Sequence, residues 1–293
     1  MRIAITGSSG RIGRALYIHL SKHHDVTGLD RAPSSTADIT ADLEDPAAVG
    51  ALLEGADAVI HAAALHAPHV GRVPDEEFER INVRATERLL DACIDRRISR
   101  FVLTSTTALY GDATKTIGAA AWIDETVEPL PKTIYHRTKL RAERMVQSAV
   151  ESGALAGVVL RMSRCFPEAA DSMACYRLHR GIDARDVASA HRWAVENLQT
   201  GFHLFVVSGA TPFRKSDLQA LALDAPGVLR VRAPRLVEAF ERRGWQLPQS
   251  IDRVYAAEAL QSLGWQPRFG FDEVFRQLDD ESSEVLVPRA FGR

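Results

Sequence analysis

This chain has few cysteines and few aromatic residues, its net charge is small, and it lacks long apolar runs. Its three cysteines, Cys93, Cys165 and Cys175, form no CxxC pair and stand near no histidines at metal-ligand spacing, so neither disulfides nor a metal site is predicted. A net charge of -2 gives no reason to expect nucleic acid or an acidic membrane as a partner. No apolar run approaches the roughly 20 residues that cross a bilayer.

What the chain does have is the composition of an ordinary globular protein. Hydrophobic residues make up 46% of its 293 residues and charged residues 25%, which permits a substantial core. This length predicts one large α/β domain, or a main domain with a smaller lobe. The N-terminus begins directly with an apolar strand pattern instead of a charged segment and a long apolar stretch, so we expect the protein in the cytoplasm.

The first half of the chain alternates short apolar runs with longer amphipathic ones, the rhythm of a parallel sheet covered by helices on both faces. Strands are predicted at residues 2–6, 26–30, 58–61, 101–104 and 157–161. Helices are predicted at residues 11–21, 46–53, 76–96 and 138–152, where apolar residues recur three and four positions apart. The pattern favours a doubly wound parallel sheet with right-handed crossovers.

The second half is less regular, which places a boundary after Arg161. Residues 1–161 are predicted to form the sheet domain, and residues 162–293 a smaller lobe that also returns elements to the sheet. Residues 162–181 carry no long periodic run and are predicted to be loops that approach a ligand. A helix is expected at 186–197, a strand at 202–208 and mixed helices from 215 to 278, and the tail from Asp279 is expected to be frayed.

A glycine-rich segment, Gly7-Ser8-Ser9-Gly10-Arg11-Ile12-Gly13, follows the first predicted strand and opens the first predicted helix. This context is typical of a loop that binds the pyrophosphate of a dinucleotide. Gly7 would permit the tight turn, Gly10 would let the backbone approach the phosphates, and Gly13 would allow close packing of helix on strand. A plain glycine turn is the alternative, and the flanking elements and an acidic residue about 20 positions on weigh against it.

That acidic residue is Asp30, at the end of the second predicted strand. A carboxylate there can accept hydrogen bonds from the adenosine ribose hydroxyls and would repel a 2′-phosphate, which favours NAD over NADP. NADP stays possible, because Arg11 and Arg31 supply guanidinium groups of the kind that bind a 2′-phosphate.

Tyr135 and Lys139 stand four residues apart, so on a helix they share one face. Alone, this spacing is also that of a solvated helix face with one aromatic anchor. The pair, however, lies downstream of a predicted strand that runs into Ser105, Thr106 and Thr107, at the sheet edge where ligands bind in open α/β folds. This placement favours a catalytic pair.

Together these motifs resemble the extended short-chain dehydrogenase/reductases of the NAD-dependent epimerase/dehydratase family, over nearly the whole chain. The matching segments are residues 6–13 for the glycine loop, Asp42-Leu43 for an acidic-Leu step that contacts adenine, His61-Ala62-Ala63-Ala64 for a cofactor turn, Asn82, Tyr135 to Lys139 with Glu143 for YxxxKxxxE, Arg161, residues 185–188, and Leu263-Gly264-Trp265 with Pro267. The resemblance implies a Rossmann fold with a C-terminal substrate lobe, and a homodimer formed through the helices at 76–96 and 138–152.

The resemblance also implies roles for individual residues. Thr106 orients the substrate, Tyr135 is the general acid and base, and Lys139 binds the nicotinamide ribose and lowers the pKa of the Tyr135 phenol. The residues expected to contact the cofactor are Gly7, Ser9, Gly10, Arg11, Ile12, Gly13, Asp30, Arg31, Asp42, Leu43, Ala62, Ala63, Ala64, Asn82, Thr104, Tyr135, Lys139 and Cys165. Those expected to contact the substrate are His66, Thr106, Thr107, Arg164 and Phe166.

The implied activity is hydride transfer between NAD(P) and a hydroxyl or carbonyl group of a small sugar-like or polyol substrate. The stretch between Arg161 and Asp186 is short, whereas nucleotide-sugar enzymes of the family carry a long insertion there. Residues 161–168 also resemble uronate dehydrogenases, with Arg164 or Arg177 as candidates to hold a carboxylate. A sugar epimerase or dehydratase that retains NAD shares every motif and stays open, while Tyr135 and Lys139 disfavour a non-catalytic cofactor sensor.

Overall fold

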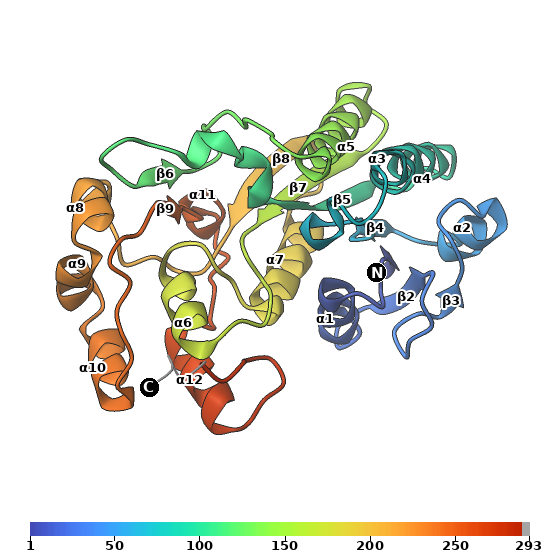
Figure 1. The fold of residues 1–293 in the computed structure, drawn as a ribbon. Helices are drawn as coiled ribbons and strands as arrows, with labels where there is room; N and C mark the ends of the chain where they lie inside the picture. Colours follow the sequence, from blue (N-terminus) through green and yellow to red (C-terminus); the bar gives the residue numbers. More distant parts are fainter. Residues whose placement is uncertain (289–293) are drawn as a thin grey trace. The chain divides into compact units, whose positions relative to one another are not determined.

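The computed structural model describes residues 1–288, which fall into two compact units (Figure 1). Unit 1 comprises residues 1–109, 131–161 and 187–205, and unit 2 comprises residues 110–130, 162–186 and the described residues from 206 on. The predicted boundary after Arg161 coincides with one passage of the chain between the units. The lobe at 162–293, with elements returned to the sheet, stays a prediction, and its residues 289–293 lie outside the described part.

In the described part of the chain, seven strands pair in the order β3-β2-β1-β4-β5-β7-β8. Their bounds are Arg2–Thr6 for β1, Asp25–Asp30 for β2, Ile39–Thr40 for β3, Ala58–His61 for β4, Arg100–Thr106 for β5, Ala156–Met162 for β7 and Phe202–Val207 for β8. The pairs from β3 to β5 run parallel. The strand order reverses between β1 and β4, so the glycine loop after β1 lies at the switch point where open α/β sheets bind ligands. This topology confirms the predicted doubly wound fold.

The helices of unit 1 connect these strands. They are α1 Arg11–Leu20, α2 Pro46–Leu52, α3 Asp75–Glu79, a π-helical turn Arg80–Arg84, α4 Ala85–Asp95, α5 Ile134–Glu151 and, from Val187 on, α7 Ala184–Asn197, with a short 3-10 turn at Ala67–His69. Apolar residues of α2, α4 and α5 pack against alternate residues of the strands in one core. Figure 1 shows α1 and α7 on the other face of the sheet.

Two helices of unit 1 differ from their predicted bounds in ways that bear on the site. The single helix expected at 76–96 contains a π-helical turn, Arg80–Arg84, between α3 and α4. The helix expected from Thr138 begins at Ile134, because the Thr133 hydroxyl caps it by accepting the His136 N–H at 3.3 Å. Tyr135 and Lys139 therefore both lie within α5, as their i, i+4 relation requires.

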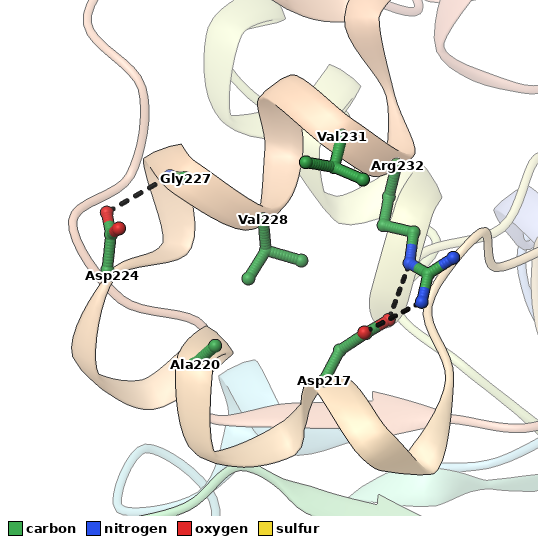
Figure 2. A pocket seen from close by; sticks show the side chains of 7 residues that line it. All are labelled: Asp217, Ala220, Asp224, Gly227, Val228, Val231 and Arg232. Atoms are coloured by element: carbon green, nitrogen blue, oxygen red, sulfur yellow. Dashed lines mark hydrogen bonds and ion pairs between the residues drawn. The ribbon is translucent and has the colours of Figure 1, made fainter.

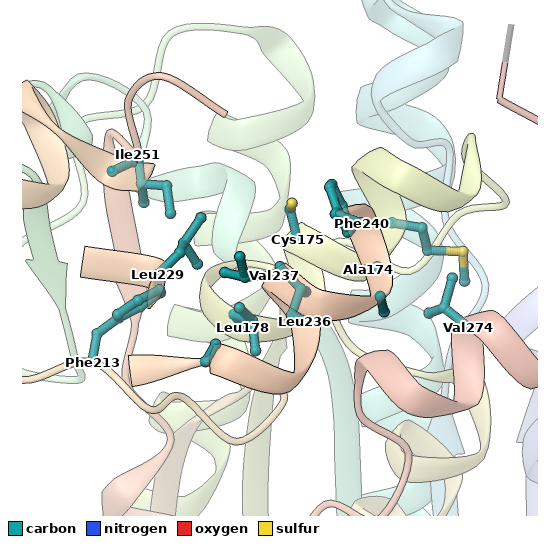
Figure 3. Packing of buried hydrophobic residues seen from close by; sticks show 14 of the residues in the cluster. Ala174, Cys175, Leu178, Phe213, Leu229, Leu236, Val237, Phe240, Ile251 and Val274 are labelled. Atoms are coloured by element: carbon teal, nitrogen blue, oxygen red, sulfur yellow. The ribbon is translucent and has the colours of Figure 1, made fainter. Parts of the chain in front are cut away.

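Unit 2 is a mostly helical unit with a two-stranded parallel sheet of β6 and β9. Its elements are η4 Asp112–Thr114, β6 Ala121–Ile123, α6 Ala170–His179, η5 Lys215–Asp217, α8 Leu218–Leu223, α9 Ala225–Arg232, α10 Pro234–Arg243, β9 Arg253–Tyr255, α11 Glu258–Ser262 and α12 Phe271–Asp279, while a 3-10 turn, Thr107–Tyr110, enters it from unit 1. Figure 3 shows its core, in which Leu178 of α6, Leu229 of α9 and Phe240 of α10 pack together.

Two expectations for this unit were wrong. Residues 162–181 are not loops throughout, because they contain α6. This helix buries residues on every side, including Met173, Cys175 and Leu178, so it lacks the apolar stripe by which a surface helix is predicted. The tail after α12 is also not frayed up to residue 288, since Val285 is buried and the Leu286 backbone pairs with Glu168 and Ala170.

Candidate functional site

The glycine loop joins β1 to α1 through backbone contacts that leave no room for side chains at two positions. Gly7 has a φ of +74°, and a Cβ there would stand 2.5 Å from the backbone nitrogen of Ala63. A Cβ on Gly13 would stand 1.9 Å from the carbonyl oxygen of Gly7. The Gly7 N–H donates to the Leu29 carbonyl at 2.8 Å, which ties the turn to β2. The packing of the protein itself therefore requires both glycines.

Gly10 is less crowded than Gly7 and Gly13, because a Cβ there would be tight against one atom only. A Cβ on Gly10 would meet one atom within 4 Å, the Gly7 carbonyl oxygen at 3.3 Å, and its φ of -68° suits any residue. Gly10 caps α1 without a side-chain hydrogen bond, and the first turn of α1 holds no acidic residue. Such a helix N-terminus favours an anion. The loop thus fits a bound pyrophosphate, with Gly10 leaving room for it.

Asp30 anchors the glycine loop to the end of β2. Its Oδ2 accepts the Ser9 N–H at 3.0 Å, and its Oδ1 accepts the Ala32 N–H at 2.9 Å. The Ser9 hydroxyl donates to the Ala32 carbonyl at 2.6 Å. Because a carboxylate oxygen can accept more than one hydrogen bond, Asp30 keeps capacity for ribose hydroxyls while it shapes the loop.

The other residues predicted to surround the adenosine lie near this strand end. Arg11 and Ile12 are half-buried in the first turn of α1, and Arg31 is exposed beside Asp30. Asp42 accepts the Glu44 N–H at 3.0 Å, and Leu43 packs against the core of unit 1. Contact between these side chains and a cofactor stays a prediction.

His61, at the end of β4, belongs to a buried hydrogen-bond chain with a fixed direction. The Thr86 hydroxyl donates to the Asn82 carbonyl at 2.9 Å, so it accepts from His61 Nε2 at 2.8 Å. His61 Nδ1 then accepts from the Thr6 hydroxyl at 2.6 Å. Burial, with a smaller effect of Lys139, lowers the pKa of His61 to about 3. The ring is therefore neutral, as this series of hydrogen bonds requires.

Asn82, predicted to contact the cofactor, uses both amide hydrogens within the protein. Its Oδ1 accepts the Leu65 N–H at 2.8 Å, and its Nδ2 donates to the Leu65 carbonyl at 2.9 Å and to the Thr138 hydroxyl at 3.1 Å. Asn82 lies in the π-helical turn and so connects the chain after β4 with α5. Its Nδ2 has no further hydrogen to donate to a cofactor.

The structure brings the three predicted catalytic residues to the carboxyl end of β5. Thr106 ends this strand, and its hydroxyl group is hydrogen-bonded to that of Tyr135. Lys139, one turn further along α5, donates from Nζ to the carbonyl oxygen of Thr104 at 2.8 Å. Tyr135 and Lys139 are both buried, with 8% and 3% of their surface exposed.

Burial dominates the electrostatics of Tyr135 and Lys139. Burial raises the pKa of the Tyr135 phenol to about 12, and the hydrogen bond from Thr106 opposes this only in part. Burial also lowers the pKa of Lys139 to about 8, which the Glu143 carboxylate partly offsets. In the protein alone the pKa of the phenol is therefore raised, and its lowering by Lys139 together with the nicotinamide ring stays a prediction.

Thr104 is held by a histidine that the sequence did not point to. Burial lowers the pKa of His191 to about 4, so its ring is neutral. His191 Nδ1 donates to the Val187 carbonyl at 2.8 Å. Its Nε2 is then the acceptor for the Thr104 hydroxyl, also at 2.8 Å. Thr104 thus fixes Lys139 with its carbonyl group, and its hydroxyl hydrogen is already donated.

Ser105, the next residue of β5, leads to a buried ion pair. Its hydroxyl donates to Glu143 Oε1 at 2.5 Å. The Glu143 carboxylate accepts from Arg161 Nε at 3.1 and 3.2 Å and from Arg161 Nη2 at 2.7 Å. The sequence offered Glu143 and Arg161 as motif residues without a role, and the spacing of Glu143 from Lys139, again four residues, was the available signal.

His66 and Thr107 were predicted to contact the substrate. His66 follows the half-buried Ala62, Ala63 and Ala64 and packs its ring edge-on against His69, with 4.5 Å between centroids. The His66 N–H also donates to His69 Nδ1 at 3.1 Å. Thr107 is buried directly after β5. These contacts suit a structural role, and substrate contact stays a prediction for both residues.

The remaining predicted residues belong to unit 2. Arg164 is paired with Glu168, and its guanidinium carbon lies 5.6 Å from the Phe166 ring centroid. Cys165 is buried and carries a free thiol. Arg177 is buried and paired with Asp183 at 3.1 Å. Both arginines considered for a substrate carboxylate are therefore already paired with carboxylates of the protein.

Unit 2 also contains a pocket of about 230 Å³ beside α8 and α9, which Figure 2 shows from close by. It is lined by Asp217, Ala220, Asp224, Gly227, Val228, Val231 and Arg232. Arg232 Nε and Nη2 donate to the Asp217 carboxylate at 2.8 and 2.9 Å. None of the predicted site residues lines this pocket.

Among residues 1–288, no group of three or more His, Cys, Asp and Glu side chains is placed to hold a metal ion. No helix in this range has the length and apolar character needed to cross a membrane.

Comparison with known proteins places the chain in a family. Residues 3–173 match the NAD dependent epimerase/dehydratase family. A 4-hydroxy-2-methyl-3-oxo-4-farnesyl-3,4-dihydroquinoline-1-oxide ketoreductase from Stigmatella aurantiaca is 35% identical over 161 residues, which span 51% of this chain and 46% of the ketoreductase. A dTDP-glucose 4,6-dehydratase from Streptomyces antibioticus is 26% identical over 95% of this chain and 92% of its own.

The fold has close counterparts among solved structures. A short-chain dehydrogenase/reductase superfamily protein from Agrobacterium tumefaciens, with bound NAD, has a TM-score of 0.70 at 21% identity over 94% of this chain and 95% of its own. This likeness confirms the predicted Rossmann fold, and the family match confirms the predicted family, with NAD as the cofactor that gives the family its name. The chain belongs to the NAD dependent epimerase/dehydratase family.

Proposed function

We propose that the chain is an NAD-dependent oxidoreductase that moves hydride between the cofactor and a hydroxyl or carbonyl group of a small sugar-like or polyol substrate. The observation that carries this proposal is the pair of hydrogen-bonded hydroxyl groups of Thr106 and Tyr135, with the Lys139 ammonium group one helical turn away. A proton donor, an orienting hydroxyl and a cation at the carboxyl end of a central strand suit carbonyl reduction and its reverse.

The glycine loop would hold the pyrophosphate, and Asp30 the adenosine ribose. Lys139 would hold the nicotinamide ribose, since an ammonium group has three N–H donors and one of them goes to the Thr104 carbonyl. When bound, the nicotinamide supplies hydride acceptor or donor chemistry. The carboxylate of Asp30 favours NAD over NADP, because its negative charge would repel the 2′-phosphate of NADP.

The proton has a defined place in this arrangement. Tyr135 would donate it to a carbonyl oxygen during reduction, or take it from a hydroxyl during oxidation, while Thr106 orients that oxygen. Because burial raises the pKa of Tyr135 to about 12, the phenol is protonated at neutral pH, which suits it to donate. The reverse direction requires added positive charge beside the phenol.

A small substrate is supported by the stretch between β7 and α7. Within residues 162–186, α6 packs its side chains into the core of unit 2, so much of this stretch builds the unit itself. Pairing of Arg164 with Glu168 and of Arg177 with Asp183 favours a neutral substrate over a uronate.

The alternative is a nucleotide-sugar epimerase or dehydratase that retains NAD. It is favoured by the dTDP-glucose 4,6-dehydratase, whose alignment covers nearly the whole chain, whereas the ketoreductase alignment covers about half. The same residues would serve in both reactions, with the hydride returned to the substrate in the alternative.

One assay separates the two. Purified protein is incubated with NAD or NADP and a panel of free sugars, polyols, uronates and hydroxy compounds, and the absorbance of reduced nicotinamide is followed. We expect net NAD reduction with a free sugar or polyol, and no tight calorimetric binding of UDP. Tight binding of UDP, with conversion of a nucleotide sugar and no net NAD reduction, would establish the alternative.

A homodimer was also expected, through the helices that are now α4 and α5. These two helices contact each other, but their exposed positions are largely charged, including Glu87, Arg88, Arg141 and Arg144. The large exposed hydrophobic side chains of the described residues, such as Ile18, Leu223 and Val231, lie outside α4 and α5. Homodimer interfaces are usually more apolar, so a dimer through α4 and α5 would be held by polar contacts, and its dissociation should depend on salt in sedimentation experiments.

A further inference from the structure

One face of α5 carries three ionisable side chains on successive turns: Tyr135, Lys139 and Glu143. Lys139 Nζ donates to the carbonyl oxygen of Thr104, and the Glu143 carboxylate accepts from the hydroxyl of Ser105. Thr104 and Ser105 are consecutive residues of β5, whose Cα atoms are about 3.8 Å apart. The same short piece of strand therefore holds the ammonium group and the carboxylate close together.

The Glu143 carboxylate is buried and accepts several hydrogen bonds. Three hydrogen bonds from Arg161 and one from Ser105 reach its two oxygens. Only 3% of Glu143 and 5% of Arg161 is exposed. Glu143 and Arg161 therefore form a buried ion pair that holds the carboxylate in one place.

The groups around Lys139 come from four elements. Tyr135 and Glu143 lie on α5, His61 at the end of β4, Arg161 on β7, and His191 of α7 behind Thr104. Burial keeps both histidines neutral, and the phenol is neutral as well. Of these groups, only Glu143 carries a charge that favours the ammonium form of Lys139.

We propose that Glu143, fixed by Arg161 and Ser105, is a positioning residue that keeps Lys139 positively charged at neutral pH, and thereby ready to bind the nicotinamide ribose. The ribose part of this statement rests on the proposed function, whereas the charge of Lys139 does not. Burial lowers the pKa of Lys139 to about 8 and Glu143 raises it, so loss of Glu143 removes the opposing influence.

Glu143→Gln keeps the shape and a hydrogen-bonding group but removes the charge. The midpoint of the Lys139 titration should fall by about one unit or more. At pH 7 the ammonium form would then drop from about nine-tenths to about one half or less. NAD affinity at pH 7 should fall accordingly and recover as the pH is lowered toward 6.

The titration can be observed directly, because the chain has five lysines, Lys22, Lys115, Lys132, Lys139 and Lys215. Lysine labelled with ¹³C at Cε gives few NMR signals, and Lys139→Arg identifies the one of interest. In the unmodified protein we expect a midpoint between about 7 and 9. A midpoint below about 7 would show a lysine that is mostly neutral at pH 7, and it would overturn the proposal without any variant.

Two further variants separate an electrostatic role from a structural one. Ser105→Ala removes one hydrogen bond of Glu143 but leaves its charge and that of Arg161, so the Lys139 midpoint should fall by less than with Glu143→Gln. An equal fall would mean that the contacts of Glu143, and not its charge, set the midpoint, and the proposal would be lost. Glu151→Gln, the same change at an exposed position of α5, serves as the control and should leave the midpoint unchanged.

Failure of this inference can be told from failure of the proposed function. The NMR titration needs neither cofactor nor substrate. If calorimetry shows NAD binding to the unmodified protein while Glu143→Gln leaves the Lys139 midpoint unchanged, the inference fails and the function stands. If the midpoint shifts but NAD does not bind, the function fails and Glu143 still sets the charge of Lys139.

Discussion

Buried charge is arranged differently in the two units. In unit 2, Asp183 lies between the buried Arg177 and the half-exposed Arg185, and Arg185 also pairs with Glu273. Burial by itself raises the pKa of Asp183, but hydrogen bonds from Arg185 and the charge of Arg177 outweigh it and leave the pKa below its usual value. In unit 1, Glu143 and Arg161 form a similar pair, but burial shifts the nearby Lys139 toward its neutral form.

The difference separates a network that holds structure from a group prepared for chemistry. In unit 2, Asp183 has direct ionic partners, and its ionised form is favoured. In unit 1, burial moves the pKa of Lys139 down and that of Tyr135 up, as is typical of functional sites. Substitutions in the first network should therefore change stability, and substitutions in the second should change activity.

The largest effect is expected for Tyr135→Phe, which removes only the hydroxyl group. Because general acid–base transfer contributes about 10²–10⁴-fold, kcat should fall by about that factor. The dissociation constant for NAD and the free energy of unfolding should change little, the latter by about 1 kcal/mol for the lost hydrogen bond to Thr106. Steady-state kinetics, calorimetry and urea unfolding provide the three measurements.

A Tyr135→Phe protein with near-normal turnover would remove the catalytic assignment. Lys139→Ala should differ from it, because it would lower turnover and NAD affinity together. If both variants lost only stability, the contrast between the units would be lost as well.

The next effect in size is on stability, for Asp183→Asn in unit 2. The change leaves Arg177 buried beside a neutral amide, and breaking a buried ion pair typically costs about 3–5 kcal/mol of unfolding free energy. Asp272→Asn is the matched control, since its pair with Arg235 is exposed and should contribute less than about 1 kcal/mol. Urea unfolding at pH 7 measures both.

The pH dependence of this effect has a definite sign. The pKa of Asp183 is lowered in the folded protein, so its stabilisation is present above the unfolded pKa of about 3.9 and is lost as the pH falls through the lowered value. The difference in stability between the unmodified protein and Asp183→Asn should therefore shrink in acid. A difference that stayed constant down to pH 2 would contradict the ion-pair explanation.

Whether a feature of the fold could be predicted from the sequence depends on how far apart in the chain its residues lie. The strands around β1 and β4 and the glycine loop were predicted closely, because local apolar runs and turn residues specify them. The π-helical turn at Arg80–Arg84 was not, since its apolar pattern continues that of the flanking helices. The short strands β6 and β9 pair across more than a hundred residues, so no local pattern could reveal them.

The same limit applies within the candidate site. Thr106, Tyr135 and Lys139 were found because strand end and helix spacing place them together. The hydrogen bond between Thr104 and His191 joins residues 87 positions apart, and no periodicity signals it. The raised pKa of Tyr135 was missed for a different reason, because the charge of Lys139 can be read from the sequence whereas burial can be judged only from the fold.

A smaller effect is expected for Asp30. Its carboxylate has both a structural role, in shaping the glycine loop, and a predicted functional role, in binding the ribose. Asp30→Asn keeps an acceptor for one backbone N–H but removes the charge. NAD affinity should fall about tenfold, for a lost charged hydrogen bond, and NADP affinity should fall less. Tighter binding of NADP than NAD by the unmodified protein would instead assign cofactor choice to Arg11 or Arg31.

The most direct test of cofactor binding in unit 1 is a calorimetric titration of NAD into Gly10→Ala. A Cβ at Gly10 meets only the Gly7 carbonyl oxygen at 3.3 Å, so the variant should fold, with a Tm within a few degrees of the unmodified protein. The same Cβ would occupy the space left for the pyrophosphate, so NAD affinity should fall by about tenfold or more. Gly13→Ala should instead lose stability, because its Cβ would stand 1.9 Å from a backbone oxygen. A folded Gly10→Ala protein that binds NAD as tightly as the unmodified protein would contradict the placement of the cofactor at this loop.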